Sequence, residues 1–526
     1  TGNVISTTAE GGDLTLTLTG SAASTIGGNL DGTTVTIIAD ANDVTVTGQT
    51  NADAVVITGS ANVDLGNVTT NVINAENATG NITADLDNDI GSGEAFVTTN
   101  SGNDTITLDN DTVEFTVNAG DGVNTIAIDD TATATGVVTG SGADTIYMND
   151  TDAAQVIVVT TGDGNDTVNV AAGAGANDTA NTGAGSDAIN LANGTSYDGL
   201  TINAGNDDDT LTFTGLGNDV TFDGGDGTDT VVMSVAGDYN DISFTSIEEI
   251  QIGGNNDVVM DAATFASDNS FNLVDLTNSQ IALTIEAEAA GSTIDASNVT
   301  FEGFNEADIL FALGDGNDIV TGSILDDAIA GGAGFDNLSG GNGDDTITGG
   351  GDDDILNGNA GNDTISGGAG NDTIDTGADG GTVGGNDGVD SITLGSGADT
   401  VVFVAAEADS YVDGTAANDT YDTVIGFDGT TDTLAVETAT GVGSVYFESL
   451  DNEAADYAAV VALANAQFAA LANNDVYVSV NAFGSGNTYV FIDSDNSGAF
   501  GAGDQLIVLT GIDELDDIEA GDFTFS

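Results

Sequence analysis

The sequence predicts an all-β protein: a right-handed parallel β-solenoid with a small C-terminal β-rich capping domain that holds one helix. Three observations predict this fold. They are a nine-residue repeat rich in glycine and aspartate, a slower repeat of 20–22 residues, and short runs in which apolar and polar residues alternate. A fixed repeat period indicates an architecture in which each repeat packs on its neighbours. When apolar and polar residues alternate along a strand, every second side chain lies on the same face.

The nine-residue repeat occupies residues 313–404. Each full repeat holds an aspartate, and an aliphatic residue stands two positions after it, as Ile347 follows Asp345. The Gly, Asn and Asp residues before that aliphatic favour a turn, because glycine tolerates positive φ. The next three residues form a short strand whose central side chain faces the core. The repeated aspartates are Asp318, Asp327, Asp336, Asp345, Asp354, Asp363, Asp372, Asp390 and Asp399.

The charge of the chain predicts what these aspartates bind. Two repeats make one coil of about 18 residues, so equivalent turns lie about 4.8 Å apart. Carboxylates this close repel one another unless cations lie between them. The chain has 87 Asp and Glu residues and no Lys, Arg or His, yet 40% of its residues are hydrophobic and need burial. The neutralising charge must therefore come from solution, and carboxylate and carbonyl oxygens favour multiple Ca²⁺ ions.

This pattern closely resembles the glycine- and aspartate-rich nonapeptide of the RTX (repeats-in-toxin) family of type I secreted proteins. The resemblance implies a β-roll with stacked calcium-binding turns, and a likeness to bacterial surface-layer and extracellular-filament proteins. Three residues depart from the pattern: Leu325 replaces a turn glycine, Phe335 occupies a polar position, and Gly381 lacks the carboxylate. We expect their coils to hold calcium poorly or not at all.

A slower repeat occupies residues 96–235. Its aspartates follow glycine-rich turns and precede strands with two inward apolar positions, such as Val168 and Val170. We predict calcium at these turns; the alternative is an aspartate that only bonds the amides of its own turn. Asn124 interrupts the series of carboxylates. The predicted ligands are Asp104, Asp144, Asp166, Asp187, Asp209 and Asp229.

Three further segments complete the domain organisation. Residues 1–95 have strand-like runs without Asp turns, which predicts solenoid coils without calcium. Residues 236–312 keep short strands but lose the repeat, so they form an irregular stretch of solenoid or a joint. Residues 405–526 are predicted to cap the solenoid: 421–434 resemble the strand pair that closes RTX arrays, and 453–472 form a helix. The final residues, 515–526, resemble C-terminal signals of type I secretion.

A loop near the C-terminus has the ligand spacing of an EF-hand. Asp493, Asp495, Ser497 and Asp504 stand at loop positions 1, 3, 5 and 12, and Gly498 stands where such a loop turns sharply. Strands flank the loop instead of helices, and position 12 is Asp where Glu is usual. We predict a calcium site here; the alternative is an acidic β-hairpin loop.

The composition argues against several classes of function. Without Lys or Arg the chain cannot neutralise phosphates, so we expect no nucleic-acid partner, and its apolar runs are too short for direct membrane insertion. Without His or Cys it lacks the usual zinc ligands and the Ser–His or Cys–His nucleophiles. We therefore expect no enzymatic activity.

Together these features predict a secreted structural protein of the cell surface or extracellular space, which folds when it meets calcium outside the cell. Copies of the chain would assemble into a surface layer, sheath or filament, either bridged by calcium or stacked end to end. Cell-surface polysaccharide is a further candidate partner. The alternatives are a calcium-stiffened adhesin or biofilm-matrix protein and, more remotely, a fragment of a secreted hydrolase.

Overall fold

The computed structural model describes most of the chain. It describes residues 4–10, 12–19, 23–27, 30–40, 42–48, 50–86, 93–110, 113–131, 134–149, 156–171, 177–192, 197, 199–215, 219–239, 242–253, 258–265, 271–275, 283–287, 291–302, 304, 309–403, 421–436, 445–449, 457–470, 476–480, 487–493, 500, 504–512 and 518–525. The chain divides into two units: unit 1 comprises residues 1–258, 269–279 and 301–303, and unit 2 comprises 259–268, 280–300 and 304–526. Each unit is a parallel β-solenoid, which confirms the predicted fold class.

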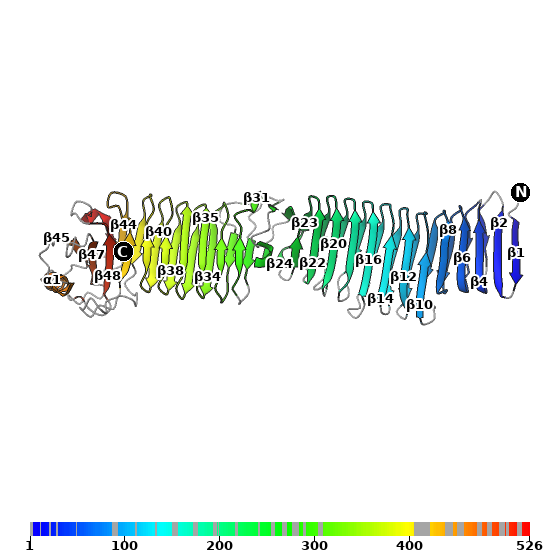
Figure 1. Cartoon of the computed structure of the whole chain (residues 1–526), viewed down its shortest axis with the longest axis horizontal. Coiled ribbons are helices and arrows are strands. Elements are labelled where there is room, and N and C mark those ends of the chain that lie inside the picture. Colours follow the sequence, from blue (N-terminus) through cyan, green and yellow to red (C-terminus); the bar gives the residue numbers. More distant parts are fainter. Residues whose placement is uncertain are drawn as a thin grey trace. The chain divides into compact units, whose positions relative to one another are not determined.

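Unit 1 is built from two stacks of parallel strands (Figure 1). As far as β21, each strand of a stack pairs with the one two positions later in the chain, and β22 and β23 then pair with β25 and β26. One stack holds β2 (Asp13–Thr19), β4 (Leu30–Ala39), β6 (Thr50–Gly59), β8 (Val72–Ala78), β10 (Gly93–Thr98), β12 (Val113–Gly120), β14 (Ala134–Thr139), β16 (Val156–Asp163), β18 (Thr179–Ala184), β20 (Leu200–Asn206), β22 (Val220–Asp226) and β25 (Ile242–Thr245). The other holds β3 (Ser24–Ile26), β5 (Val44–Val46), β7 (Val63–Val68), β9 (Ile82–Leu86), β11 (Thr105–Asn110), β13 (Thr125–Thr131), β15 (Thr145–Met148), β17 (Thr167–Val170), β19 (Ala188–Leu191), β21 (Thr210–Phe213), β23 (Thr230–Met233), β26 (Glu249–Ile252) and β28 (Asn272–Asp275). β1 (Val4–Glu10) differs, because it pairs antiparallel with β2.

The core of unit 1 follows from the alternation within its strands. Ile146 pairs with Ile126 on one side and with Val168 on the other, and all three side chains are fully buried. Equal positions therefore stack on one another, so each coil covers the apolar face of the next. The strands within residues 30–86 pair in the same parallel way, although their turns lack the repeated aspartates.

Unit 2 repeats this arrangement with a shorter coil. One stack holds β29 (Leu283–Glu286), β32 (Ile309–Ala312), β34 (Asp327–Ala333), β36 (Thr346–Gly351), β38 (Thr364–Ala369), β40 (Thr382–Asp387), β42 (Thr400–Phe403), β44 (Thr433–Val436) and β49 (Phe523–Phe525). The other holds β30 (Thr293–Asp295), β33 (Ile319–Thr321), β35 (Asn337–Asn342), β37 (Ile355–Ala360), β39 (Thr373–Asp375), β41 (Ser391–Thr393), β43 (Asp422–Ile425) and β48 (Gln505–Thr510). Ile347 pairs with Ile365, eighteen residues later, which confirms that two nonapeptides form one coil.

The solenoid of unit 2 continues beyond residue 404. We predicted that residues 421–434 close the array as a strand pair. Instead, β43 pairs parallel with β41 and β44 pairs parallel with β42, so the two strands form another coil. β48 and β49 then pair parallel with β43 and β44. The stretch proposed as a secretion signal thus contributes β49, the last strand of its stack.

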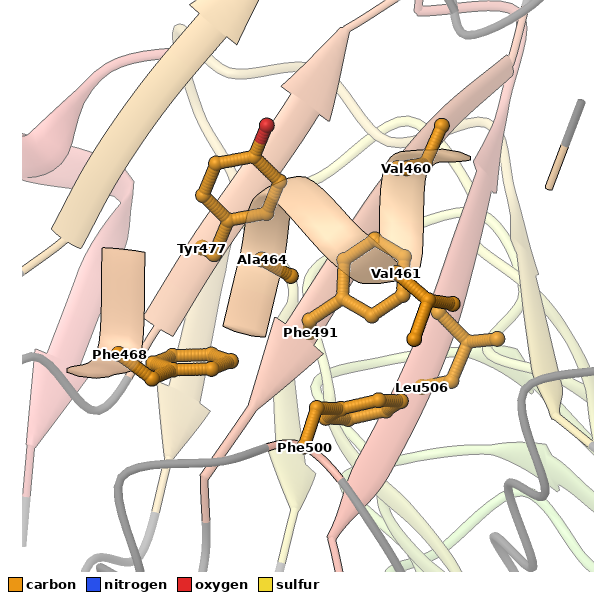
Figure 2. Close-up of a cluster of buried hydrophobic side chains, with 8 residues drawn as sticks. All are labelled: Val460, Val461, Ala464, Phe468, Tyr477, Phe491, Phe500 and Leu506. Carbon is orange, nitrogen blue, oxygen red and sulfur yellow. The ribbon is translucent and has the colours of Figure 1, made fainter. Parts of the chain in front are cut away.

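A small cap is attached to β48. β47 (Asn487–Ile492) pairs antiparallel with β48, β46 (Val476–Val480) antiparallel with β47, and β45 (Val445–Ser449) parallel with β46. The predicted helix is α1 (Tyr457–Ala470), the one α-helix among the described residues. Figure 2 shows its buried side chains against aromatic rings of the sheet. The helix contributes Val460, Val461, Ala464 and Phe468. They pack against Tyr477 of β46, Phe491 of β47, Leu506 of β48, and Phe500, which lies between β47 and β48 in the chain.

Residues 236–312 contain the remaining short elements. They are β24 (Gly237–Tyr239), β27 (Val258–Asp261), the 3-10 helix η1 (Ala262–Phe265) and β31 (Thr300–Glu302), and a second 3-10 helix, η4 (Ala520–Asp522), precedes β49. Within the described residues, no helix is long and apolar enough to cross a membrane.

Candidate metal centre

The repeated aspartates of unit 2 are buried and bonded from coil to coil. Asp345 is 1% exposed, and its Oδ1 accepts a hydrogen bond at 2.8 Å from the backbone N–H of Asp327, eighteen residues earlier. The resulting ladders extend the coil-to-coil pairing of the strands into the turns. Ladder A consists of Asp318, Asp336, Asp354, Asp372, Asp390 and Asp422. Ladder B consists of Asp327, Asp345 and Asp363 and, after a gap at Gly381, of Asp399 and Asp432.

The second carboxylate oxygen of most of these aspartates is buried without a hydrogen-bond partner. This is true of Oδ2 in Asp318, Asp336, Asp345, Asp354, Asp363, Asp372 and Asp399. A buried carboxylate oxygen without a donor is strongly unfavourable unless a cation or proton satisfies it. Since the chain has no basic side chain, a cation from solution is the group that fits.

The surroundings of Oδ2 consist of other oxygens. A Cβ added to Gly349 would lie 2.4 Å from Asp354 Oδ2 and 2.5 Å from the carbonyl oxygen of Gly367, one coil later. The carboxylate oxygen and the carbonyl oxygen thus both border the space beside Gly349. Among the described residues, no three acidic side chains converge on one point. Turn carbonyls must therefore supply the other ligands of a calcium ion, as oxygen-only calcium sites allow.

Asn124 shows what these turns need when the carboxylate is absent. Its Oδ1 accepts the N–H of Asp104 at 3.0 Å, as an aspartate would. Its Nδ2, in the position of the second carboxylate oxygen, donates to the carbonyls of Gly120 and Gly122 at 3.2 and 3.3 Å. Those carbonyls therefore face the end of the side chain and accept a donor there. An aspartate brings a negative oxygen to the same place, so a cation must take over the role of the amide.

Unit 1 has a single ladder of the same kind. Each carboxylate accepts the N–H of the residue one coil earlier, for example Asp166 from Asp144 at 2.7 Å. The bonds span 20–22 residues, so these aspartates link neighbouring coils and do not simply bond their own turn. Oδ2 is buried and has no hydrogen-bond partner in Asp104, Asp144, Asp166, Asp187, Asp209 and Asp229. Glu248 ends the ladder by accepting the N–H of Asp229.

The three departures from the repeat differ in their consequences. In the Leu325 coil, the N–H of Ser323 donates to Asp327 Oδ2 at 2.6 Å, so this carboxylate is satisfied within its own turn. At Gly381 the ladder lacks a carboxylate, although the Gly381 N–H still donates to Asp399. The Phe335 side chain is 46% exposed, and the adjacent Asp336 still forms its hydrogen bond in ladder A.

Burial raises the pKa of several ladder carboxyls, among them Asp345, Asp354 and Asp209. Desolvation is the largest cause, opposed by the hydrogen bond from the neighbouring coil and reinforced by the adjacent carboxylates. In unit 2 the pKa of Asp345 rises to about 8 and that of Asp354 to about 7. In unit 1 the pKa of Asp209 rises to about 7. For Asp144, the nearby Thr139 hydroxyl lowers the pKa and opposes desolvation.

The calcium-free fold is therefore expected to be more stable in mild acid than at neutral pH. The folded chain retains protons up to a pKa of about 8 at Asp345, whereas the unfolded chain loses them near the ordinary value of 3.8. The free energy of unfolding thus falls as the pH rises from the ordinary pKa of 3.8 to the raised pKa of about 8. Circular dichroism of the full chain in chelator should show more β structure at about pH 5 than at about pH 8. Equal signals at both values would contradict the expectation.

Besides Glu248, two ladder residues were not predicted from the sequence. Asp422 accepts the N–H of Asp390 at 2.9 Å, and Asp432 accepts that of Asp399 at 3.1 Å. Both are followed by Thr and then by an aliphatic residue, which is the pattern of the nonapeptides. In the predicted EF-hand loop, Asp493 and Asp504 are both 2% exposed. Asp495 and Ser497 lie outside the described residues, so that site stays a prediction.

Comparison with known families identifies the turns of unit 2. The model of the RTX calcium-binding nonapeptide repeat matches residues 321–356 and 348–383. Residues 321–383 are an RTX array. RTX repeats bind calcium, so the array takes several Ca²⁺ ions, and the ladder aspartates with their lone Oδ2 are the residues that fit them. None of the curated proteins compared with the chain matches it.

Proposed function

We propose that the chain is an extracellular structural protein that folds on binding calcium and assembles with copies of itself into a surface layer, sheath or filament. The observation that carries this proposal is the row of buried carboxylate oxygens without partners along the RTX array. Each of them is unfavourable until calcium arrives, so the array is a fold that depends on the ion. RTX repeats are typical of secreted proteins.

Calcium concentration explains how such a chain is exported and then folds. Extracellular calcium modules bind with dissociation constants of about 10⁻⁴–10⁻³ M, so they are filled outside the cell and empty in the cytosol. Each site adds stability by mass action, by about 1.4 kcal/mol when calcium exceeds the dissociation constant tenfold. Several such sites exceed the whole stability of a typical domain.

The surface of the array favours assembly through calcium. Asp344 and Asp353 are exposed, and each lies beside a ladder aspartate in successive turns. Exposed carboxylates such as these make the surface acidic, on a chain with no basic residue. Two such surfaces repel each other until divalent ions bridge them. Calcium-bridged contact between copies is thus the first mode of assembly we propose, and end-to-end stacking is the second.

A hollow in unit 1 favours the adhesin as a second candidate, with polysaccharide as its partner. The hollow has a volume of about 240 Å³ and lies beside Ala171 and Ala192, where small side chains leave space. Its wall includes Asn169 and Asn190, whose side chains are bonded to each other at 3.1 Å. Tyr147, which is 38% exposed, pairs with Asn169 on the neighbouring strand. Amides next to an exposed aromatic ring are groups that suit sugar hydroxyls and ring faces.

Calcium titration of the full chain tests the main proposal. We expect circular dichroism to show a large loss of β structure in excess chelator and its steep, cooperative recovery as calcium reaches about the millimolar range. Electron micrographs should show ordered sheets or fibres only with calcium. Complete β structure in chelator would refute calcium-driven folding, and dispersed single molecules at saturating calcium would refute assembly. Retention by a polysaccharide column without assembly would favour the adhesin.

A further inference from the structure

The turns of the two units differ at their first residue. In both units a six-residue turn ends on the ladder residue. We call a turn a glycine turn when it begins with Gly and a threonine turn when it begins with Thr. The glycine turns with a lone Oδ2 are Gly331–Asp336, Gly340–Asp345, Gly349–Asp354, Gly358–Asp363 and Gly367–Asp372 in unit 2 and Gly224–Asp229 in unit 1. The threonine turns are Thr99–Asp104, Thr139–Asp144, Thr161–Asp166 and Thr182–Asp187, all in unit 1.

In a glycine turn, no side chain fits at the first residue. A Cβ added to Gly358 would lie 2.2 Å from Asp363 Oδ2 and 2.6 Å from the carbonyl oxygen of Thr376, one coil later. Gly224 in unit 1 shows the same arrangement, with Asp229 Oδ2 at 2.4 Å and the carbonyl oxygen of Ser246 at 2.3 Å. The two oxygens approach this point from neighbouring coils, and neither is a donor. A cation bound by these two oxygens would join one coil to the next.

In a threonine turn, a hydroxyl group already makes that connection. Thr139 Oγ1 donates to the carbonyl of Thr161 at 2.6 Å, Thr161 Oγ1 to that of Thr182 at 2.8 Å, and Thr182 Oγ1 to that of Ala204 at 2.9 Å. Thr99 donates in the same way to Ala119 at 2.7 Å. The accepting carbonyl belongs to the first residue of the next turn, as the carbonyl of Gly367 does beside Gly349. In these turns the carbonyl is therefore occupied, and a buried side chain fills the space beside it.

We infer that, in turns that begin with Gly or Thr, this first residue decides whether the turn holds calcium: glycine turns with a lone Oδ2 bind it, and threonine turns replace it with a hydroxyl bond between coils. This inference rests on the proposed calcium-driven folding and refines it. The calcium sites then include the turn Gly224–Asp229 in unit 1, far from the matched RTX repeats in sequence. In the threonine turns at Asp104, Asp144, Asp166 and Asp187, the hydroxyl bond joins the coils without the ion. The same hydroxyl also lies beside the ladder carboxyl, whose Oδ2 has no hydrogen-bond partner. The coils of the threonine turns are thus independent of calcium, whereas those of the RTX array depend on it.

Hydrogen exchange of the full wild-type chain tests this division directly. In chelator, peptic peptides from residues 156–191 should stay protected while those from 327–387 exchange; with calcium, both should be protected. Simultaneous exchange of both segments in chelator would overturn the inference and leave calcium-driven folding intact. Protection of both segments in chelator would instead refute calcium-driven folding itself.

Substitutions at the first turn residue test the site chemistry by the number of bound ions, measured by equilibrium dialysis and elemental analysis. Thr161→Gly with Thr182→Gly should add up to two Ca²⁺ per chain, whereas Thr161→Ser with Thr182→Ser, which keep the hydroxyls, should add none. Gly349→Thr with Gly367→Thr should remove two. If the variant with Thr161→Gly and Thr182→Gly keeps its protection from hydrogen exchange but binds no more Ca²⁺ than the wild type, the inference is contradicted.

Discussion

Replacing Gly350 by alanine is expected to destabilise the RTX array severely, whereas the same change at the adjacent Gly351 should be tolerated. Gly350 has φ +120°, in the region that L-residues rarely adopt, and an added Cβ would lie 2.1 Å from the carbonyl oxygen of Gly332. The backbone strain alone costs about 1–3 kcal/mol. The steric overlap adds to it, because the neighbouring coil cannot move away without breaking its own strand pairs.

Gly351 provides the matched control. Its φ lies outside that region, and the nearest atom to an added Cβ is Gly332 O at 3.9 Å. The change should alter stability by no more than about 0.5 kcal/mol. Urea unfolding at saturating calcium measures both variants. Similar losses at the two positions would show that any side chain in β36 disturbs the array, which contradicts the argument from φ and coil spacing.

The repeat in the sequence predicts the solenoid well, because the necessary information is local. A turn of Gly, Asn and Asp followed by a three-residue strand fixes both the coil and its inward side chain, and Ile347 over Ile365 confirms the eighteen-residue coil. The slower repeat works in the same way in unit 1, where Ile146 stacks on Ile126. Periodicity is sufficient when each coil contacts only the next one.

The same reasoning fails where an insertion breaks the period. Asp422 follows Asp390 by 32 residues and Asp432 follows Asp399 by 33, in place of the regular eighteen. A fixed spacing cannot show that β43 and β44 return to the stacks, since their partners are chosen by pairing in space. The local pattern of Asp, Thr and an aliphatic residue is the better signal, because it describes the turn and strand themselves.

For the site, the sequence predicts the ligand type but not its environment. The aspartates are evident from their spacing, and their burial follows from their place before inward strands. The direction of each bond, from the N–H of Asp327 to the carboxylate of Asp345, depends on contact between coils. The difference between Gly349 and Thr161 is visible in the sequence, yet its meaning appears only when the facing carbonyl is seen. Contacts between coils determine which of the similar turns require an ion.

The second large effect is expected from Asp345→Asn, and its sign should depend on calcium. The new Oδ1 can still accept the N–H of Asp327, which bonds the carboxylate at 2.8 Å in the wild type. The new Nδ2 can donate to the carbonyls of its own turn, as Asn124 donates to Gly120 and Gly122. In chelator the variant should be more stable than wild type, because a buried carboxyl with its pKa raised to about 8 is removed. In calcium it should be less stable, since the stabilisation from one site, about 2.7 kcal/mol at a hundredfold excess, is lost.

Asp345→Ala separates the hydrogen bond from the charge. Alanine removes the calcium ligand as asparagine does, but it also leaves the Asp327 N–H without its acceptor, at a cost of about 1–3 kcal/mol. The alanine variant should therefore be less stable than the asparagine variant both in calcium and in chelator. Urea unfolding of the wild type and both variants, with and without calcium, measures the three-way comparison. If asparagine destabilised the chain equally with and without calcium, Asp345 would be a purely structural link between coils, and the case for its lone oxygen as a calcium ligand would fail.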